Sequence, residues 1–310
     1  MSMAKQILID CDPGLDDGVA LLAAFGTDEL NVLAVTTVAG NVPGPLTADN
    51  ARTIVSLTER GNQIPICAGA PRPILRDLVT AEDFHGSTGL GGIEFPRPVL
   101  PLSATHSANQ IIETCIATNN PLTLVITGPM TNVALALIMS PEIADSIDEI
   151  VLMGGADSEG GNITPFAEFN VFADPHAAEI VFQSGLPIRV LNLDVTHTIR
   201  TTKSRLATVR EIGNAQALAV CALLDASCQL EFSAKNQRDA PLHDPSTIIA
   251  LTAPQLFEGR RAHVSVITIP GDTFGQTKIR YDEDGPVLWY QAANSDGVFK
   301  ELCRLLGGYS

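Results

Sequence analysis

The sequence predicts an α/β fold in which a mostly parallel open sheet is flanked by helices, with a small C-terminal antiparallel extension. Three observations support this prediction. Short apolar runs alternate with segments of helical periodicity as far as about residue 200. Several of these runs end at Gly, Asn or Asp, which are typical of turns. After that point the alternation stops, and long helical segments precede three strand-like runs.

The first apolar run, residues 6–12, predicts a buried strand that Pro13 and Gly14 end. Further helices are expected over residues 15–26, 46–60, 107–118, 131–139 and 175–184. Further strands are expected over residues 31–38, 64–68, 122–127, 149–153 and 188–193. This alternation is typical of a Rossmann-like sheet that is covered on both faces.

The C-terminal third is expected to be helical over 202–232 and 245–253, with a closing helix over 295–306. Between them, residues 264–269, 277–281 and 287–291 are expected to form an antiparallel meander. Because no repeat or linker interrupts the chain, we expect a single domain over residues 1–310. The loop over 76–101 and the segment before His243 are long enough to be lids.

Composition excludes some classes of function. The 19 basic and 35 acidic residues give a formal charge of −16, which argues against binding to nucleic-acid phosphates and suits a cation site. The six cysteines form no CxxC pair and are typical of a reducing compartment. We find no signal peptide and no apolar run near the roughly 20 residues that span a bilayer. We therefore expect a cytoplasmic protein with no membrane or nucleic-acid partner.

The stretch after the first strand holds Asp10, Asp12, Asp16 and Asp17, and we call residues 10–17 the acidic turn. Open α/β sheets place their sites at such strand ends. Because the four carboxylates repel each other, a hard cation such as Ca²⁺ or Mg²⁺ is the simplest partner. Alternatively, Asp16 and Asp17 only favour a helix N-terminus, by about 0.3–1 kcal/mol each. That alternative leaves Asp10 and Asp12 unexplained, so a metal or catalytic site is favoured.

Polar residues follow other strands as well. Thr36, Asn41, Thr127 and Met153 all come at or after strand ends, so they would meet at one sheet edge if the strands are neighbours. Each of them alone is ordinary turn chemistry. The neighbouring Cys11 is not expected to be a nucleophile, because nearby carboxylates raise the pKa of a thiol.

Two further groups of polar residues lie outside the regular elements. The segment 161–170 holds Asn162, Glu168 and Asn170, which could orient hydroxyl groups, although a polar surface loop is the simpler interpretation. Asp244 could cap the helix that starts at Pro245. This cap does not explain why His243 and His85 are present. Even so, a lone histidine is more often structural than catalytic.

Taken in order, these motifs resemble the inosine-uridine nucleoside hydrolases. The resemblance spans nearly the whole chain and rests on residues 10–17, 38–41, 85–86, 127–132, 151–155, 161–162, 167–175 and 243–245. It implies an N-ribosyl hydrolase that cleaves ribonucleosides to ribose and free base, in purine or pyrimidine salvage. It also implies a homodimer or homotetramer.

The resemblance also implies roles for individual residues. Ca²⁺ would be bound by Asp12, Asp17, Asp244 and the backbone carbonyl of Thr127. The ribose would contact Asp16, Asn41, Met153, Asn162, Glu168, Asn170 and Asp244, while His85 and His243 would face the base. Asp12 would act as general base on a calcium-bound water, and His243 would protonate the leaving base.

The sequence departs from the family at the base-contacting helix. Members often carry a tyrosine or another base-contacting residue eight to twelve positions before the His-Asp motif, where this chain has Glu231 and Lys235. Base preference and the identity of the leaving-group acid therefore stay open. Purine-specific relatives stack the base between tryptophans, and the single Trp289 disfavours purine-only specificity.

Two other functions compete with this one. A metal-dependent phosphohydrolase of the haloacid dehalogenase type also starts with a strand that ends in Asp-x-Asp. This chain has Gly14 where such enzymes carry Thr or Val, and no second acid follows Asp272 at the expected spacing. A catalytically inactive nucleoside-binding protein is disfavoured because Asp12, Asp17 and Asp244 are all present.

Overall fold

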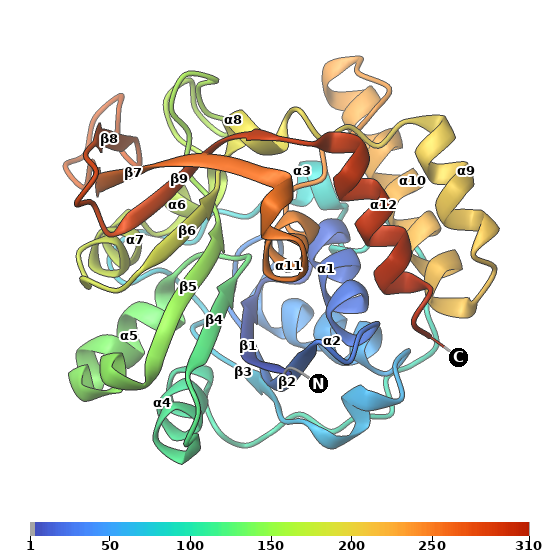
Figure 1. The fold of residues 1–310 in the computed structure, drawn as a ribbon, viewed down its shortest axis with the longest axis horizontal. Coiled ribbons are helices and arrows are strands. Elements are labelled where there is room, and N and C mark those ends of the chain that lie inside the picture. Colours follow the sequence, from blue (N-terminus) through green and yellow to red (C-terminus); the bar gives the residue numbers. More distant parts are fainter. Residues whose placement is uncertain (1–3, 310) are drawn as a thin grey trace.

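A computed structural model describes residues 4–309, which contain one nine-stranded sheet with the order β3-β2-β1-β4-β5-β6-β9-β7-β8 (Figure 1). The strands are β1 Lys5–Cys11, β2 Leu30–Thr37, β3 Ile66–Ala68, β4 Leu122–Ile126, β5 Ile147–Met153, β6 Ile188–Leu191, β7 Phe257–Val266, β8 Thr277–Tyr281 and β9 Val287–Ala293. In this spatial order, every pair of neighbouring strands between β3 and β9 is parallel. The last two pairs, β9 with β7 and β7 with β8, are antiparallel. The predicted fold class is confirmed.

Helices cover both faces of this sheet (Figure 1). They are α1 Leu15–Phe25, α2 Gly44–Val55, α3 Glu82–His85, α4 Ser107–Ala117, α5 Thr131–Met139, α6 Phe169–Ala173, α7 Pro175–Phe182, α8 Leu193–Thr196, α9 Lys203–Glu211, α10 Ala215–Lys235, α11 Pro245–Thr252 and α12 Ser295–Leu306. Successive side chains of a strand point to opposite faces. In β1, Ile7 and Ile9 therefore pack against α1, α10 and α12, while Leu8 joins the core under α4, α5 and α7.

The helix expected over 202–232 is divided into α9 and α10. Gly213 adopts a φ of +81° between them, which favours glycine and ends the first helix. The side chain of Asn214 then caps α10 by accepting a hydrogen bond from the Ala217 amide at 2.8 Å. The other expected helices and parallel strands lie within a few residues of their predicted positions, except that α2 ends at Val55.

The expected meander was wrong in its order, because β9 pairs with β6 and β7 rather than with β8. Val287 and Trp289 of β9 are buried, as in a central strand, whereas β8 alternates between buried and exposed residues as an edge strand. Strand β7 also begins at Phe257, seven residues before the predicted start at 264. The first half of β7 was missed because its exposed side carries charged residues, which interrupt the apolar run by which strands were predicted.

The helix α10 contains a stretch, Ala215–Ala234, that is long and apolar enough to cross a membrane by length and composition alone. By this criterion, the expectation that no apolar run comes near 20 residues was wrong for α10. One face of this helix, including Val220, Leu223 and Leu224, is buried in the core that it shares with α1. A core helix of this kind meets the same criterion without spanning a membrane.

Candidate active site

The chain reverses its direction of travel across the sheet at β1. From β1 it moves outward through β2 and β3, then returns to β4 on the other side of β1 and continues through β5 and β6. Parallel sheets bind ligands at the carboxyl ends of the strands where this reversal occurs. Asp12 follows β1 and Thr127 follows β4, so the condition that the strand-end residues come from neighbouring strands is met.

Asp17 organises the acidic turn. Its Oδ2 accepts hydrogen bonds from the Gly14 amide and the Asn41 side chain, both at 3.0 Å. Its Oδ1 accepts one from the Thr127 hydroxyl at 2.7 Å and one from the Asp12 amide at 3.3 Å. Asp17 thus caps α1, as the structural alternative expected, and also joins the ends of β1, β2 and β4.

Asp12 lies fully buried beside this network. Its Oδ2 accepts a hydrogen bond from the Asn41 amide at 2.7 Å, while its Oδ1 is buried without a hydrogen-bond partner. Gly40 and Gly128 enclose the carboxylate. A Cβ atom at Gly40 would lie 2.0 Å from Oδ2, and one at Gly128 would lie 2.7 Å from Oδ1. An unpartnered buried carboxylate oxygen is costly in an apolar surrounding and is typical of a group that awaits a ligand.

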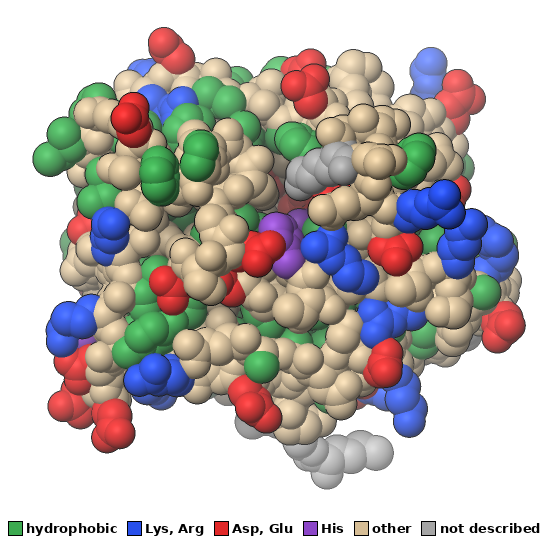
Figure 2. Space-filling view, turned by 90° about the horizontal axis from the view of Figure 1, so that it is seen from above, with side chains coloured by type: hydrophobic (Ala, Val, Ile, Leu, Met, Phe, Trp, Pro, Cys, Tyr) green, Lys and Arg blue, Asp and Glu red, His purple; other side chains and the backbone are tan. Residues whose placement is uncertain are grey.

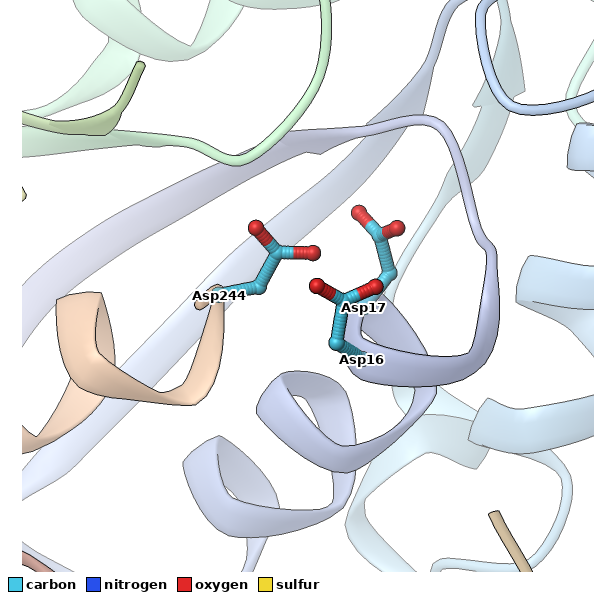
Figure 3. A group of neighbouring side chains, drawn as sticks. All are labelled: Asp16, Asp17 and Asp244. Atoms are coloured by element: carbon cyan, nitrogen blue, oxygen red, sulfur yellow. The ribbon is translucent and has the colours of Figure 1, made fainter. Parts of the chain in front are cut away.

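Asp16, Asp17 and Asp244 bring their carboxylates together although Asp244 is more than two hundred residues away in the chain (Figure 3). One oxygen of each lies within 4.8 Å of the others, which is close enough to hold a metal ion. Asp244 precedes α11 but makes no side-chain capping hydrogen bond, so the capping interpretation of this carboxylate was wrong. Oxygen ligands of this kind suit a hard divalent cation.

Burial raises the pKa of every carboxylate in this group. The pKa of Asp17 rises to about 6, and those of Asp12 and Asp244 rise well above the ordinary value. After burial, repulsion by neighbouring carboxylates, above all Asp17 for Asp12 and Asp16 for Asp244, contributes further. A bound cation would reverse these directions, because it favours the ionised carboxylates.

Asp10 is a buried residue of the acidic turn that is hydrogen-bonded to neighbouring elements. Its Oδ1 accepts hydrogen bonds from the Thr36 hydroxyl at 2.7 Å and the Asn132 amide group at 2.8 Å, and burial raises its pKa to about 7. It does not line the pocket described below. Burial and then the Asp17 carboxylate raise the pKa of Cys11, which agrees with the expectation that this thiol is not a nucleophile.

A pocket opens above the acidic turn, and Figure 2 shows histidine side chains in a hollow on this face. One wall of the pocket comes from residues 161–170, for which a polar surface loop was the simpler interpretation. Glu168 there caps α6 by accepting hydrogen bonds from the amides of Asn170 and Val171, and it also accepts one from the Gly155 amide after β5. Burial raises the pKa of Glu168 to about 7. Buried and multiply bonded, Glu168 is not a surface residue.

The amides of the same wall are held in place. Asn170 donates hydrogen bonds through Nδ2 to the Thr127 carbonyl at 2.7 Å and the Met153 carbonyl at 3.2 Å. Asn162 Oδ1 accepts one from the Phe169 amide at 2.9 Å, which leaves its NH₂ group for other contacts. Both side chains line the pocket with Met153, Asn41 and Asp16, so the structure gathers the residues that the sequence assigned to the sugar.

His85 reaches the pocket through α3, a short helix in the long loop over 76–101. Its Nδ1 accepts a hydrogen bond from the Leu15 amide at 3.2 Å, at the N-terminus of α1. Burial lowers the pKa of His85 to about 4, so the ring is neutral near pH 7 and carries its proton on Nε2. His85 can therefore donate a hydrogen bond but is a poor source of protons.

His243 also lines the pocket, and its Nδ1 lies 2.8 Å from the Thr196 hydroxyl. Sequence reasoning missed other pocket residues, notably His197 and Ser227. His197 lies just past α8, which follows β6, so its position after a strand end could have identified it. Glu231, at one of the positions where the sequence departs from the family, is buried and lines the pocket. The side chain of Lys235 lies outside the described residues.

Comparison with known proteins identifies the family that this site belongs to. The sequence model described as inosine-uridine preferring nucleoside hydrolase matches residues 7–300. The chain belongs to this family. The nucleoside hydrolase family resemblance noted from the motifs is therefore confirmed, and the protein is an enzyme that hydrolyses N-glycosyl bonds.

Individual relatives of this nucleoside hydrolase differ in the substrates that their names give. A pyrimidine-specific ribonucleoside hydrolase of Photobacterium profundum is 42% identical over 288 residues, which cover 92% of each chain. A purine-preferring ribonucleoside hydrolase from Gardnerella vaginalis superposes with a TM-score of 0.90 at 27% identity and 98% coverage of both chains. A plant nucleoside hydrolase superposes with a TM-score of 0.89 at 28% identity, covering 98% of this chain and 99% of its own.

Proposed function

We propose that this nucleoside hydrolase cleaves the N-glycosidic bond of ribonucleosides with Asp12 as general base, releasing ribose and the free base. The observation that carries the proposal is the convergence of three carboxylates, those of half-buried Asp16 and buried Asp17 and Asp244, at a pocket that is lined by the amides of Asn162 and Asn170. Oriented carboxylates and amides of this kind suit the hydroxyl groups of a sugar and a cationic transition state.

The proposed metal ion is Ca²⁺, held by the carboxylates of Asp12, Asp17 and Asp244 and by the Thr127 carbonyl. The donor set fits a hard cation, since all donors are oxygens and Asp12 Oδ1 is buried without a partner. Asp16 Oδ1 is also buried and unpartnered, and we assign it to a ribose hydroxyl. When bound, the ion would neutralise the carboxylates and make a nearby water more acidic.

In this proposal Asp12 takes a proton from the attacking water as its oxygen forms a bond to C1′ of the ribose. The C1′–N bond breaks, and its electron pair leaves with the base. Positive charge then develops on the sugar ring, where the carboxylates of Asp16, Glu168 and Asp244 stabilise it. Asn41, Asn162 and Asn170 hold the ribose hydroxyls, and Met153 packs beside the sugar.

His243 is assigned to the leaving base. The Thr196 hydroxyl donates its hydrogen to the Asn192 carbonyl at 3.1 Å, so it accepts a hydrogen bond from His243 Nδ1. Acting as the acid, a doubly protonated His243 gives the Nε2 proton to the departing base and keeps the hydrogen on Nδ1. His85, which is neutral with its hydrogen on Nε2, donates a hydrogen bond to the base but no proton.

Pyrimidine ribonucleosides are the first substrates that we propose. A relative 42% identical to this chain is named as pyrimidine-specific. The single tryptophan, Trp289, is buried in β9 and does not line the pocket, so it cannot stack on a purine there. We further propose that the enzyme acts on free nucleosides in the cytoplasm as a homodimer or homotetramer, which light scattering of the purified protein would test.

The experiment is to incubate the enzyme with uridine, cytidine, inosine, adenosine and guanosine in phosphate-free buffer and to quantify free ribose and free base. Equal amounts of the two products, with pyrimidine nucleosides cleaved fastest, are expected. Binding without ribose release would support a nucleoside-binding protein. Release of phosphate from a phosphate ester such as p-nitrophenyl phosphate, with no ribose from any nucleoside, would support the phosphohydrolase alternative.

A further inference from the structure

A hydrogen-bonded pair next to His243 has no role in the proposed mechanism. His197 Nδ1 lies 2.8 Å from Glu159 Oε1, and the side chain of His197 is only 17% exposed. A carboxylate accepts hydrogen bonds, so the proton of His197 resides on Nδ1. His197 also lines the pocket, whereas Glu159 is not among the residues that line it.

The loop that carries Glu159 is fixed to the helix that precedes His197. Asp194 of α8 accepts hydrogen bonds from the amides of Asp157, Ser158 and Glu159, at 2.7, 2.8 and 2.9 Å, and from the Ser158 hydroxyl at 2.6 Å. Burial would raise the pKa of Asp194, but these hydrogen bonds hold it below the ordinary value. The hydrogen bonds of Asp194 therefore set the distance between Glu159 and His197.

Two consecutive residues at the end of α8 touch His243. Thr196 contacts its Nδ1, and the His197 ring lies 5.6 Å from the His243 ring, centroid to centroid, at an angle of 56°. The Thr196 contact fixes one atom of the ring, and the His197 ring limits rotation about that atom. The two contacts together fix both the position and the tilt of the imidazole.

We propose that the Glu159–His197 pair is a positioning device for His243, which holds its ring where a proton can pass from Nε2 to the departing base. This inference rests on the proposed function. His197 acts through His243, so its loss affects only reactions that need a proton on the leaving group. A substrate whose leaving group departs as a stable anion does not need that proton.

The test compares His197→Ala and Glu159→Gln with wild type on uridine and on p-nitrophenyl riboside, whose nitrophenolate leaves without protonation. For His197→Ala we expect kcat on uridine to fall about 10–100-fold, within the range for general acid catalysis, and kcat on p-nitrophenyl riboside to change less than about 2-fold. Glu159→Gln should show the same split with a smaller loss. KM for either substrate should change little.

His263→Ala and Glu258→Gln are the matched controls, because both residues are exposed on β7 away from the pocket. Activity on p-nitrophenyl riboside also reports whether each variant is folded. Equal losses on both substrates, or no loss on uridine, would overturn the positioning role. A wild-type enzyme that cleaves neither substrate would instead overturn the proposed function, so the two failures are distinguishable.

Discussion

Asp12 occupies a space that its neighbours define closely. Gly40 and Gly128 leave no room for a methyl group beside its carboxylate, and the Asn41 amide holds Oδ2. This leaves Oδ1 as the atom that can receive a proton or contact an ion. The proposed role of Asp12 as general base therefore requires both that its side chain be a carboxylate and that it stay in this position.

Replacing the carboxylate tests the first requirement. In Asp12→Asn the side chain keeps its size but cannot accept a proton from water, so kcat on uridine should fall by about 10²–10⁴-fold. The Tm should stay within a few degrees, since a neutral amide costs less to bury than a charge. Asp145→Asn, at an exposed position, is the control. A variant with near-normal kcat would show that another group is the base.

Moving the carboxylate tests the second requirement. A methyl group in Gly40→Ala would lie 2.0 Å from Asp12 Oδ2 and 2.8 Å from Pro129 Cδ, so the carboxylate must shift. Displacements of about 1 Å at a reacting group can cost about 10²-fold in rate, and we expect a loss of this order in kcat on uridine. Gly271→Ala, where a Cβ meets nothing within 4 Å, should retain full activity. Equal activity of the two variants would contradict the packing argument.

Much of the candidate site could be predicted from single residues. Asp16, Asn41, Met153, Asn162, Glu168 and Asn170 do line one pocket, as the motif resemblance implied. His197 was missed, because its position after a predicted strand end was the one signal for it, and its local sequence otherwise resembles that of a structural histidine. Its place depends on α8, a helix of four residues that is too short to show a helical period.

At the scale of elements, one ion-pair group joins three strands at the end of the sheet opposite the site. Glu149 of β5 accepts two hydrogen bonds from Arg189 of β6, at 2.7 and 2.8 Å, and one from Lys5 of β1 at 2.6 Å. Burial alone would raise the pKa of Glu149, but Arg189 and then Lys5 hold it below the ordinary value. The group therefore stabilises the folded state only while Glu149 is ionised.

Glu149→Gln should lower the free energy of unfolding by about 1–3 kcal/mol at pH 7, because it weakens hydrogen bonds to two charged groups. The folded-state pKa lies below the unfolded one, so this contribution is present above about pH 4.5 and is lost as the pH falls through the folded value. Denaturant unfolding at pH 7 and pH 3 should show the difference shrink at low pH. The exposed Glu142→Gln is the control, and a difference that does not depend on pH would contradict the ion-pair explanation.

The elements that could be predicted are those with a long, regular apolar pattern. Strands β1 and β4 are buried on both faces and are read as continuous apolar runs. The short helices α3, α6 and α8 were missed, and all three carry or adjoin pocket residues. Their formation depends on side-chain hydrogen bonds, such as those by which Glu168 caps α6 and holds the Gly155 amide, rather than on local periodicity.

At the scale of the whole molecule, the site exists because the chain crosses β1 and continues on its other side. This reversal brings the ends of β1, β2, β4 and β5 together beneath Asp244, which arrives from the far C-terminal part of the chain. Alternation of strands and helices predicted the fold class but not the strand order. The order of β7, β8 and β9 was missed because pairing depends on long-range burial rather than on nearby sequence.

The most direct test of the account is the rate of ribose release from uridine after removal of bound metal. Because the carboxylates of Asp12, Asp16, Asp17 and Asp244 repel one another, we expect the proposed ion to be needed for activity. Enzyme stripped with a calcium chelator should lose activity by at least about 10²-fold and recover it when Ca²⁺ is added back, with about one ion bound per chain. Full activity in the stripped enzyme, with no ion detected by elemental analysis, would contradict the account.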